Sequence, residues 1–216
     1  ASEIGLEAFG YNIENRHLLA ALDARAQTLS SLTRIEDEAR AVETTESRVS
    51  VSLRGGDRIA AKLVIGADGR RSLCRTAAGI ESDGHTYPQT ALTFNLAHAR
   101  PHQDTSTEFH TENGPFTLVP LPGDRSSLVC VVEPTDAERI AALDGAVLND
   151  EIEQRSHSIL GRITIEPGRG IFPLAVETVR SFGQSRIALV GEAAHLIPPI
   201  GAQGLNLGLL DSATIS

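Results

Sequence analysis

The sequence predicts an α/β (α+β) fold in which a domain of buried strands and helices is interrupted by an inserted mixed β-sheet. Two short apolar runs, Leu63–Ile65 and Ile187–Val190, each lead through a glycine-containing turn into a helical pattern, and they predict the first domain. Between them, from about Thr90 to Pro134, the pattern changes to alternating strands, which predicts the insertion. The expected division of the chain is into the segments 1–85, 86–170 and 171–216.

The first segment is predicted to begin with a helix over residues 14–28, because its apolar residues recur at helical spacing. The side chains predicted to face the core are Leu18, Leu19, Leu22 and Ala26. A small antiparallel meander should follow, with a turn at Gly55-Gly56-Asp57 before the buried strand that starts at Leu63. Its three predicted strands are 32–38, 41–45 and 48–53.

The inserted segment is predicted to combine strands with two helices. The predicted strands are 91–97, 107–111, 116–120 and 127–132. The predicted helices are 136–143 and 148–159, and acidic residues in the first turn of the second would complement its dipole. After these helices the chain should return through Phe172 to the second apolar strand.

Composition excludes several function classes. The net charge is −9 with no basic cluster, which argues against a nucleic-acid partner. Cys74 and Cys130 have neither metal-site nor CxxC spacing, so we expect two buried thiols in a reducing compartment and no metal. We expect no signal peptide, and the sequence has no apolar run near the ~20 residues of a bilayer span. We therefore expect a cytoplasmic protein, with peripheral membrane association as an alternative.

The most informative string is RIALVGEAAHLIPPIGAQGLNLGLLDSA, near the C-terminus. Glu192 follows the apolar strand, at the end where open α/β sheets bind ligands. Two prolines then force an extended path, and glycines open an apolar helix over 205–213. Backbone amides, a helix N-terminus and a carboxylate would thus meet at one place, which suits a large, partly anionic cofactor. The alternative is a plain strand-turn-helix corner with Glu192 in solvent.

A second string, LVIGADGRRSLCR, lies upstream at residues 63–75. Its Gly66-Ala67-Asp68-Gly69 turn tolerates positive φ, and Ser72 is well placed to cap a helix over 73–78. Taken alone, this string indicates only a common strand-turn-helix junction.

Together and in this order, the two strings resemble those of the flavin-dependent aromatic hydroxylases, the p-hydroxybenzoate hydroxylase-like enzymes, and more closely their ubiquinone-biosynthesis branch. The residues that match GADGxxSxxR are Gly66, Ala67, Asp68, Gly69, Ser72 and Arg75. The matches in the later string are Gly191, Ala193, Ala194, His195, Pro198, Pro199, Gly201, Gly204, Asn206 and Asp211. Many relatives carry Asp in place of Glu192.

The resemblance implies an FAD-binding, Rossmann-like domain with an inserted mixed β-sheet that binds substrate. The cofactor-binding residues that it implies are Asp68, Gly69, Gly191, Glu192, Pro199, Gly201, Gly204, Leu205 and Asn206. Glu192 would contact the flavin ribityl chain, and amides from Gly204 to Asn206 would stabilise negative charge near flavin N1 and O2. Arg75 would support the first turn.

The resemblance also implies an activity. NAD(P)H would reduce the flavin, and a flavin C4a-hydroperoxide would then hydroxylate an aromatic ring, here a phenol of ubiquinone biosynthesis that can carry a polyprenyl chain. Association with a membrane surface or a biosynthetic complex would fit such a substrate. Two alternatives stay open: another flavoenzyme of the same fold, such as a halogenase, epoxidase or reductase, and a non-catalytic scaffold or accessory protein.

No catalytic residue can be named from the sequence. His195 is a tempting candidate because histidine is the usual residue of acid–base chemistry, but a packed histidine that anchors the strand-to-loop turn is the favoured interpretation. An apolar substrate pocket has weak candidates, for which ordinary core packing is favoured: Phe94, Phe116, Leu118 and Pro120.

The GxGxxG unit that binds the ADP half of FAD in such enzymes has no counterpart in the sequence. Gly5 to Gly10 has the wrong spacing, and Gly168-Arg169-Gly170 is followed by Ile171-Phe172-Pro173 rather than by a helix start. We therefore expect an internal fragment, truncated at both ends and inactive alone.

Overall fold

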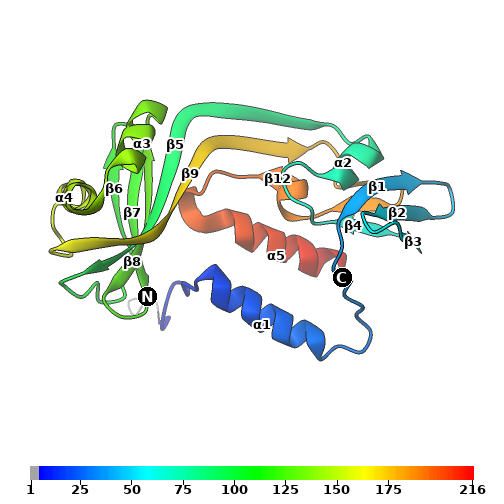
Figure 1. The fold of residues 1–216 in the computed structure, drawn as a ribbon, viewed down its shortest axis with the longest axis horizontal. Coiled ribbons are helices and arrows are strands. Elements are labelled where there is room, and N and C mark those ends of the chain that lie inside the picture. Colours follow the sequence, from blue (N-terminus) through cyan, green and yellow to red (C-terminus); the bar gives the residue numbers. More distant parts are fainter. Residues whose placement is uncertain (1–4) are drawn as a thin grey trace. The chain divides into compact units, whose positions relative to one another are not determined.

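The computed structural model describes residues 5–216, except for the side chain of Ile200, so the first four residues of the predicted segment 1–85 lie outside the described part (Figure 1). Its helices are α1 Asn15–Gln27, α2 Leu73–Ala78, α3 Pro134–Ala142, α4 Gly145–Arg155 and α5 Gln203–Ile215. Its strands are β1 Ala39–Thr44, β2 Val49–Leu53, β3 Arg58–Ala61, β4 Val64–Gly66, β5 Ser82–His98, β6 Thr107–Thr111, β7 Gly114–Leu121, β8 Arg125–Val132, β9 Ile163–Val179, β10 Gly183–Gln184, β11 Ile187–Leu189 and β12 His195–Leu196.

Contacts divide the chain into two compact units. Unit 1 consists of the residues up to Arg34 together with Gln89–Phe172, and unit 2 consists of Ile35–Pro88 together with Pro173–Ser216. This grouping places α1 with the inserted segment, whereas the sequence-based division placed it with the first segment. The domain boundaries 1–85, 86–170 and 171–216 stay predictions.

The small sheet of unit 2 is an antiparallel meander in the order β1-β2-β3. The predicted strand 32–38 is wrong, and the third strand is Arg58–Ala61, which lies beyond the predicted glycine turn. The reason is local: the Asp37 carboxylate accepts a hydrogen bond from the Gly55 amide at 3.0 Å, so this segment braces the turn instead of pairing as a strand.

The two apolar runs pair with each other in unit 2. β11 and β4 are parallel, with Leu189 opposite Gly66, so their carboxyl ends reach the same edge of the sheet. Ile187 and Leu189 are buried in a core with α2, as predicted. The prediction of a buried strand at Leu63 is wrong for the side chains of Leu63 and Ile65, which are 51% and 46% exposed. In the order β10-β11-β4, β4 is an edge strand, so among the described residues no strand pairs with its outer side.

The larger sheet has the order β12-β9-β5-β8-β7-β6. In unit 1, Phe94, Leu128 and Leu118 lie side by side on β5, β8 and β7, because the antiparallel register pairs Leu128 with both others. Together with Phe116, this face packs against apolar residues of α3 and α4. The three candidates Phe94, Phe116 and Leu118 are therefore core residues, and the core-packing interpretation is confirmed for them.

Two helix predictions need correction. α1 forms where predicted but has no buried residue, and Leu19 and Leu22 are 61% and 51% exposed, because the described residues of unit 1 leave that side of the helix uncovered. α4 begins at Gly145 rather than at 148 and ends at Arg155, so the acidic residues Asp150 and Glu151 lie in its second turn and not at its N-terminus.

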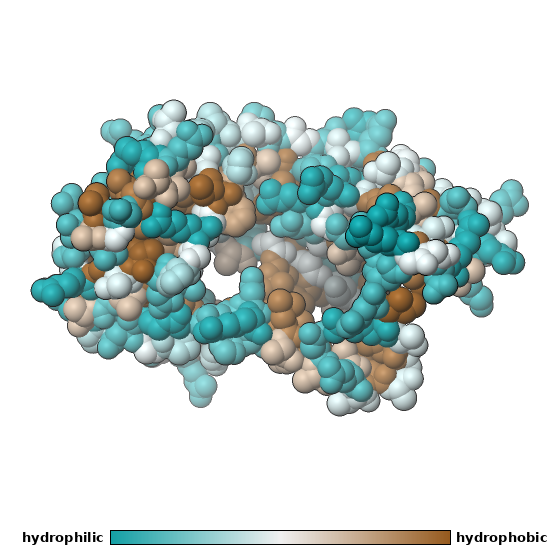
Figure 2. Space-filling view, viewed as in Figure 1, coloured by the Kyte–Doolittle hydropathy of each residue, from teal (hydrophilic) through white to brown (hydrophobic). Residues whose placement is uncertain are grey.

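Exposed apolar side chains also occur on α5, at Leu205, Leu209 and Leu210. Figure 2 shows hydrophobic residues interspersed with hydrophilic ones over the visible face. Over residues 5–216, no helix has both the length and the apolar character needed to cross a membrane.

Candidate cofactor site

The first predicted turn is closed by hydrogen bonds around Asp68. The Ser72 hydroxyl donates to Asp68 Oδ1 at 2.6 Å, and the Cys74 amide donates to Oδ2 at 3.1 Å. Ser72 also caps α2, as predicted, by accepting from the Arg75 amide at 2.9 Å. Partial burial raises the pKa of Asp68, but the bonds from Ser72 and from backbone amides outweigh it and hold the pKa below its ordinary value. Asp68 is thus a carboxylate fixed at the N-terminus of a helix.

The backbone beside Asp68 is open. Gly69 has φ +76°, and a Cβ placed there would meet no atom within 4 Å. A ligand could therefore approach this stretch of main chain closely.

Arg75 links the first turn to the second. Its guanidinium donates to the Ala193 carbonyl at 3.1 Å and to the Arg70 carbonyl at 2.6 Å, and it lies 3.4 Å from the Glu177 carboxylate. Support of the turn, which the resemblance implied for Arg75, has a direct structural basis in these contacts.

Glu192 stands at the carboxyl end of β11, in the 3₁₀ turn η2 Gly191–Ala193. Its carboxylate accepts a hydrogen bond from Arg70 Nε at 3.2 Å, and both side chains are about half exposed. Gly191 has φ +59°, which favours glycine. Sequence reasoning missed Arg70, because only the parallel pairing of β4 and β11 brings it beside a residue 122 positions away.

The glycine-rich segment leads into α5 as predicted, but the helix begins at Gln203 rather than at Leu205. Pro199 precedes a second 3₁₀ turn, η3 Ile200–Ala202, in which Gly201 has φ +77°. Ala202 is left-handed at φ +51° and no side chain caps α5, so the first amides of the helix have no partner within it. A Cβ at Gly204 would meet nothing within 4 Å. This N-terminus offers N–H donors and the positive end of a dipole, which suit an anionic group.

Leu205 and Asn206 lie in the first turn of α5. Leu205 is exposed, and the Asn206 side-chain amide donates to the Ala202 carbonyl at 3.0 Å. α5 meets the Gly191 turn through its middle, at Gly208. Since an α-helix rises about 1.5 Å per residue, the start of α5 lies about 7.5 Å along its axis from that contact.

Unit 2 thus carries every predicted cofactor-binding residue. The turns at Asp68 and Glu192 adjoin at one edge of the sheet and are joined by Arg70 and Arg75. Whether each residue binds a cofactor stays a prediction. His195 lies in β12 and contacts Asp211, with its side chain only 11% exposed, a geometry that favours a packed histidine over a general base.

The family follows from comparison of the whole sequence. The family model described as "FAD binding domain" matches residues 11–216. The chain belongs to this family of FAD-binding domains. The predicted family and the cofactor FAD agree with this match.

Relatives of this FAD-binding domain include two ubiquinone hydroxylases. "Ubiquinone hydroxylase UbiL" of Rhodospirillum rubrum is 35% identical over 208 residues, which cover 96% of this chain and 48% of that protein. The 3-demethoxyubiquinol 3-hydroxylase of Escherichia coli is 34% identical over 212 residues, covering 98% of this chain and 54% of that protein. The chain therefore spans about half the length of these relatives.

The FAD-binding domain also has solved structural neighbours. The crystal structure of pqsL, "a probable FAD-dependent monooxygenase from Pseudomonas aeruginosa", superimposes with a TM-score of 0.71 at 22% identity, covering 93% of this chain and 57% of pqsL. This likeness confirms the predicted α/β fold class.

The residues of the site fit FAD. The uncapped amides of α5 and the open backbone at Gly69 and Gly204 can receive anionic or carbonyl groups. The half-exposed Glu192 carboxylate can accept hydrogen bonds from hydroxyls such as those of a ribityl chain.

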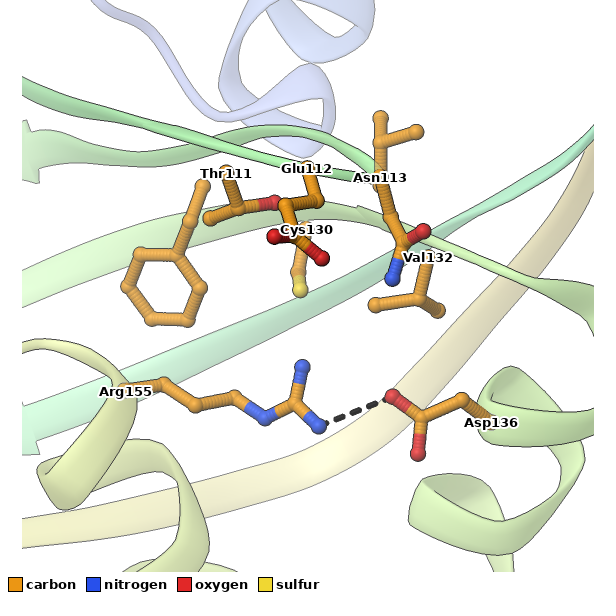
Figure 3. A pocket seen from close by; sticks show the side chains of 9 residues that line it. Thr111, Glu112, Asn113, Cys130, Val132, Asp136 and Arg155 are labelled. Carbon is orange, nitrogen blue, oxygen red and sulfur yellow. Dashed lines mark hydrogen bonds and ion pairs between the residues drawn. The ribbon is translucent and has the colours of Figure 1, made fainter.

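A separate hollow of about 300 Å³ lies within unit 1 (Figure 3). Arg155 and Asp136 lie on one side of it, facing Cys130 and Glu112 across the hollow. The guanidinium is already paired, with Asp136 at 2.8 Å and Glu151 at 2.8 Å. None of these residues is among the predicted cofactor-binding residues.

Proposed function

We propose that this chain supplies the ribityl- and isoalloxazine-binding part of the FAD site in a monooxygenase that hydroxylates an aromatic ring in ubiquinone biosynthesis. The observation that carries the proposal is the junction of two turns at the carboxyl ends of β4 and β11, joined through Arg70–Glu192 and Arg75–Ala193. The family match and the names of the relatives support it.

Each part of the site has a task that its chemistry suits. Glu192 accepts hydrogen bonds from ribityl hydroxyls, and the turn Asp68-Gly69 lies along the ribityl and pyrophosphate region. Pro199 and Gly201 shape the loop that leads into α5. The amides at the start of α5, from Gly204 to Asn206, stabilise negative charge at the N1 and O2 side of the isoalloxazine. When bound, the flavin takes electrons from NAD(P)H and activates O₂ for transfer to the ring.

The aromatic substrate needs a surface other than the core of unit 1. Because Phe94, Phe116 and Leu118 are packed under α3 and α4, the substrate would lie on the opposite face of that sheet. That face carries Thr93 and Val129, which are paired in the register and half-buried. It offers apolar contacts beside a hydroxyl.

The substrate class follows from the relatives. We infer a phenol that carries a polyprenyl chain, in keeping with the ubiquinone hydroxylases among them. Such a chain is drawn into a bilayer, so we also propose a cytoplasmic enzyme that works at a membrane surface or within a biosynthetic complex.

Titration of FAD, followed by quenching of its fluorescence, tests the proposal. We expect weak or absent binding to the 216-residue chain and restored binding when the encoded upstream sequence is added, because the turns described here hold one half of FAD. Failure of the extended chain to bind FAD would contradict the proposal. Oxygen consumption and product analysis with NADH or NADPH and a polyprenylated phenol then separate a hydroxylase from a scaffold.

A further inference from the structure

One carboxylate oxygen in α5 accepts two hydrogen bonds from other elements. Asp211 Oδ2 receives the Gly191 amide at 2.9 Å and lies 2.7 Å from His195 Nε2. Gly191 belongs to the turn that carries Glu192, and His195 belongs to β12. Asp211 therefore connects α5 both to the turn η2 and to the strand β12.

The proton on this histidine can be placed from its partners. An ionised carboxylate only accepts hydrogen bonds, so His195 Nε2 carries the hydrogen. His195 Nδ1 is buried and has no hydrogen-bond partner in residues 5–216. A second proton there would be a buried donor without an acceptor, which is costly. The geometry therefore favours Nε2 of His195 as the donor to Asp211.

The sequence of α5 agrees with a contact made at this point. Glycine and aspartate are both poor residues for a helix interior, yet Gly208 and Asp211 stand three positions apart on one side of α5. A Cβ at Gly208 would lie 3.4 Å from Gly191 Cα, so the helix passes close to the turn there. The side chains of His195 and Asp211 are 11% and 20% exposed, and water competes weakly for their bond.

We infer that Asp211 is a positioning residue of the flavin site: with His195 it locks α5 onto the Gly191 turn, and it thereby sets the start of α5 and Glu192 relative to each other. The inference rests on the proposed function, because it is the bound flavin that would sense this geometry. Gly191 directly precedes Glu192, and α5 is a continuous helix from Gln203 to Asp211. A shift at Asp211 would therefore move both flavin-facing groups.

The test uses full-length protein and two readouts, the Kd for FAD and the visible absorption spectrum of the bound flavin. Asp211→Ala should raise the Kd at least tenfold and shift the flavin bands. Asp211→Asn keeps one side-chain oxygen as an acceptor and should raise the Kd for FAD less than Asp211→Ala does. His195→Gln keeps a donor near the Nε2 position and should stay closer to wild type than His195→Leu. Ser212→Ala is the matched control, because the exposed Ser212 hydroxyl donates to the Gly208 carbonyl within α5 and, among residues 5–216, has no bond to another element.

The outcomes distinguish a failure of the proposed function from a failure of the inference about Asp211. If wild-type protein fails to bind FAD, the proposed function fails. If wild type binds but Asp211→Ala keeps its Kd and spectrum and only melts at a lower temperature, Asp211 is merely structural and the inference is overturned. If Asp211→Ala does not fold, the variants Asp211→Asn and His195→Leu decide the question. A wild-type Kd for FAD and a wild-type flavin spectrum in both of them would overturn the inference. Nitrogen-15 NMR of His195 should show a hydrogen on Nε2, and a hydrogen on Nδ1 alone would refute the donor role.

Discussion

Asp68 uses its negative charge to hold a helix end in place, and this makes the turn sensitive to acid. Its pKa is lowered in the folded chain, since the bonds from Ser72 and from backbone amides outweigh the opposing effect of burial. A carboxylate with a lowered folded pKa stabilises the fold above its unfolded pKa, and this stabilisation is lost as the pH falls through the folded pKa.

Asp68→Asn should therefore lower the melting temperature at pH 7, and this effect should fade as the pH falls through the lowered pKa of Asp68, because the wild-type carboxyl then becomes protonated as well. We expect a loss in unfolding free energy of no more than about 1 kcal/mol, because Asp68 is exposed enough for water to screen it. Thermal melts of both proteins across this pH range provide the measurement. A difference in melting temperature that stays the same as the pH falls would show that charge has no part in the effect.

Glu192 offers a residue-scale test of the flavin contact. Glu192→Gln keeps the side-chain shape but removes the charge, so full-length protein should bind FAD several-fold more weakly with its melting temperature unchanged. Arg70→Ala should also leave stability within about 1 kcal/mol, since its pair with Glu192 is exposed. Glu192→Asp, which keeps a carboxylate on a shorter side chain, should retain most of the affinity. Equal affinity in wild type and Glu192→Gln would remove Glu192 from the site.

Sequence patterns predicted residue roles well where the partners are local. The Ser72 cap follows from its position three residues before Arg75, and the structure shows that bond. The partners of Glu192 and His195, by contrast, depend on strand pairing and helix docking. Arg70 lies 122 residues from Glu192, and Asp211 lies 16 from His195 on another element. No local pattern specifies such contacts.

At the scale of elements, the same distinction separates correct from missed strands. β6 was predicted at its observed bounds because alternation marks it. β9 was missed, since its sequence ITIEPGRGIFPLAVETV contains two prolines and two glycines that indicate turns, yet it forms a long strand. Pairing with neighbours overrides these local signals. The predicted strand 32–38 failed for the converse reason, because Asp37 is engaged by the turn at Gly55.

α1 is an element held by polar contacts rather than by a core. It has no buried residue, and a helix of 13 residues is marginal alone. In unit 1 the preceding Glu14 pairs with Arg125 at 2.9 Å, and Arg125 also binds Glu166 at 2.7 Å. Asn12 donates to the Pro120 carbonyl at 3.3 Å.

Arg125→Gln should therefore speed hydrogen exchange of the amides of α1, by several-fold or more, while the amides of α3 keep their protection. Hydrogen-exchange mass spectrometry gives the measurement. Arg54→Gln is a suitable control, because Arg54 pairs with exposed Glu38 on the meander. Unchanged exchange in α1 would mean that Arg125 does not anchor it.

At the scale of the whole molecule, the described residues form two separate hydrophobic cores. One core lies under α3 and α4 in unit 1, and the other joins β11 to α2 in unit 2. The predicted cofactor residues all belong to unit 2, so ligand binding should stabilise the two units unequally. Whole-sequence resemblance predicted the cofactor, but only the fold shows that one unit carries the residues assigned to it.

FAD added to full-length protein should therefore slow hydrogen exchange around the Asp68 turn and across residues 191–206, and leave α3 and α4 unchanged. At a free concentration 100 times the Kd, binding stabilises the bound form by about 2.7 kcal/mol, which corresponds to roughly 100-fold slower exchange for amides that open only when the site is lost. Slower hydrogen exchange around the hollow beside Cys130 and Arg155 would contradict this expectation, because it would place the ligand in unit 1. Protection confined to unit 2 would instead tie FAD to the junction of β4, β11 and α5, since that junction is where the uncapped amides and Glu192 are held.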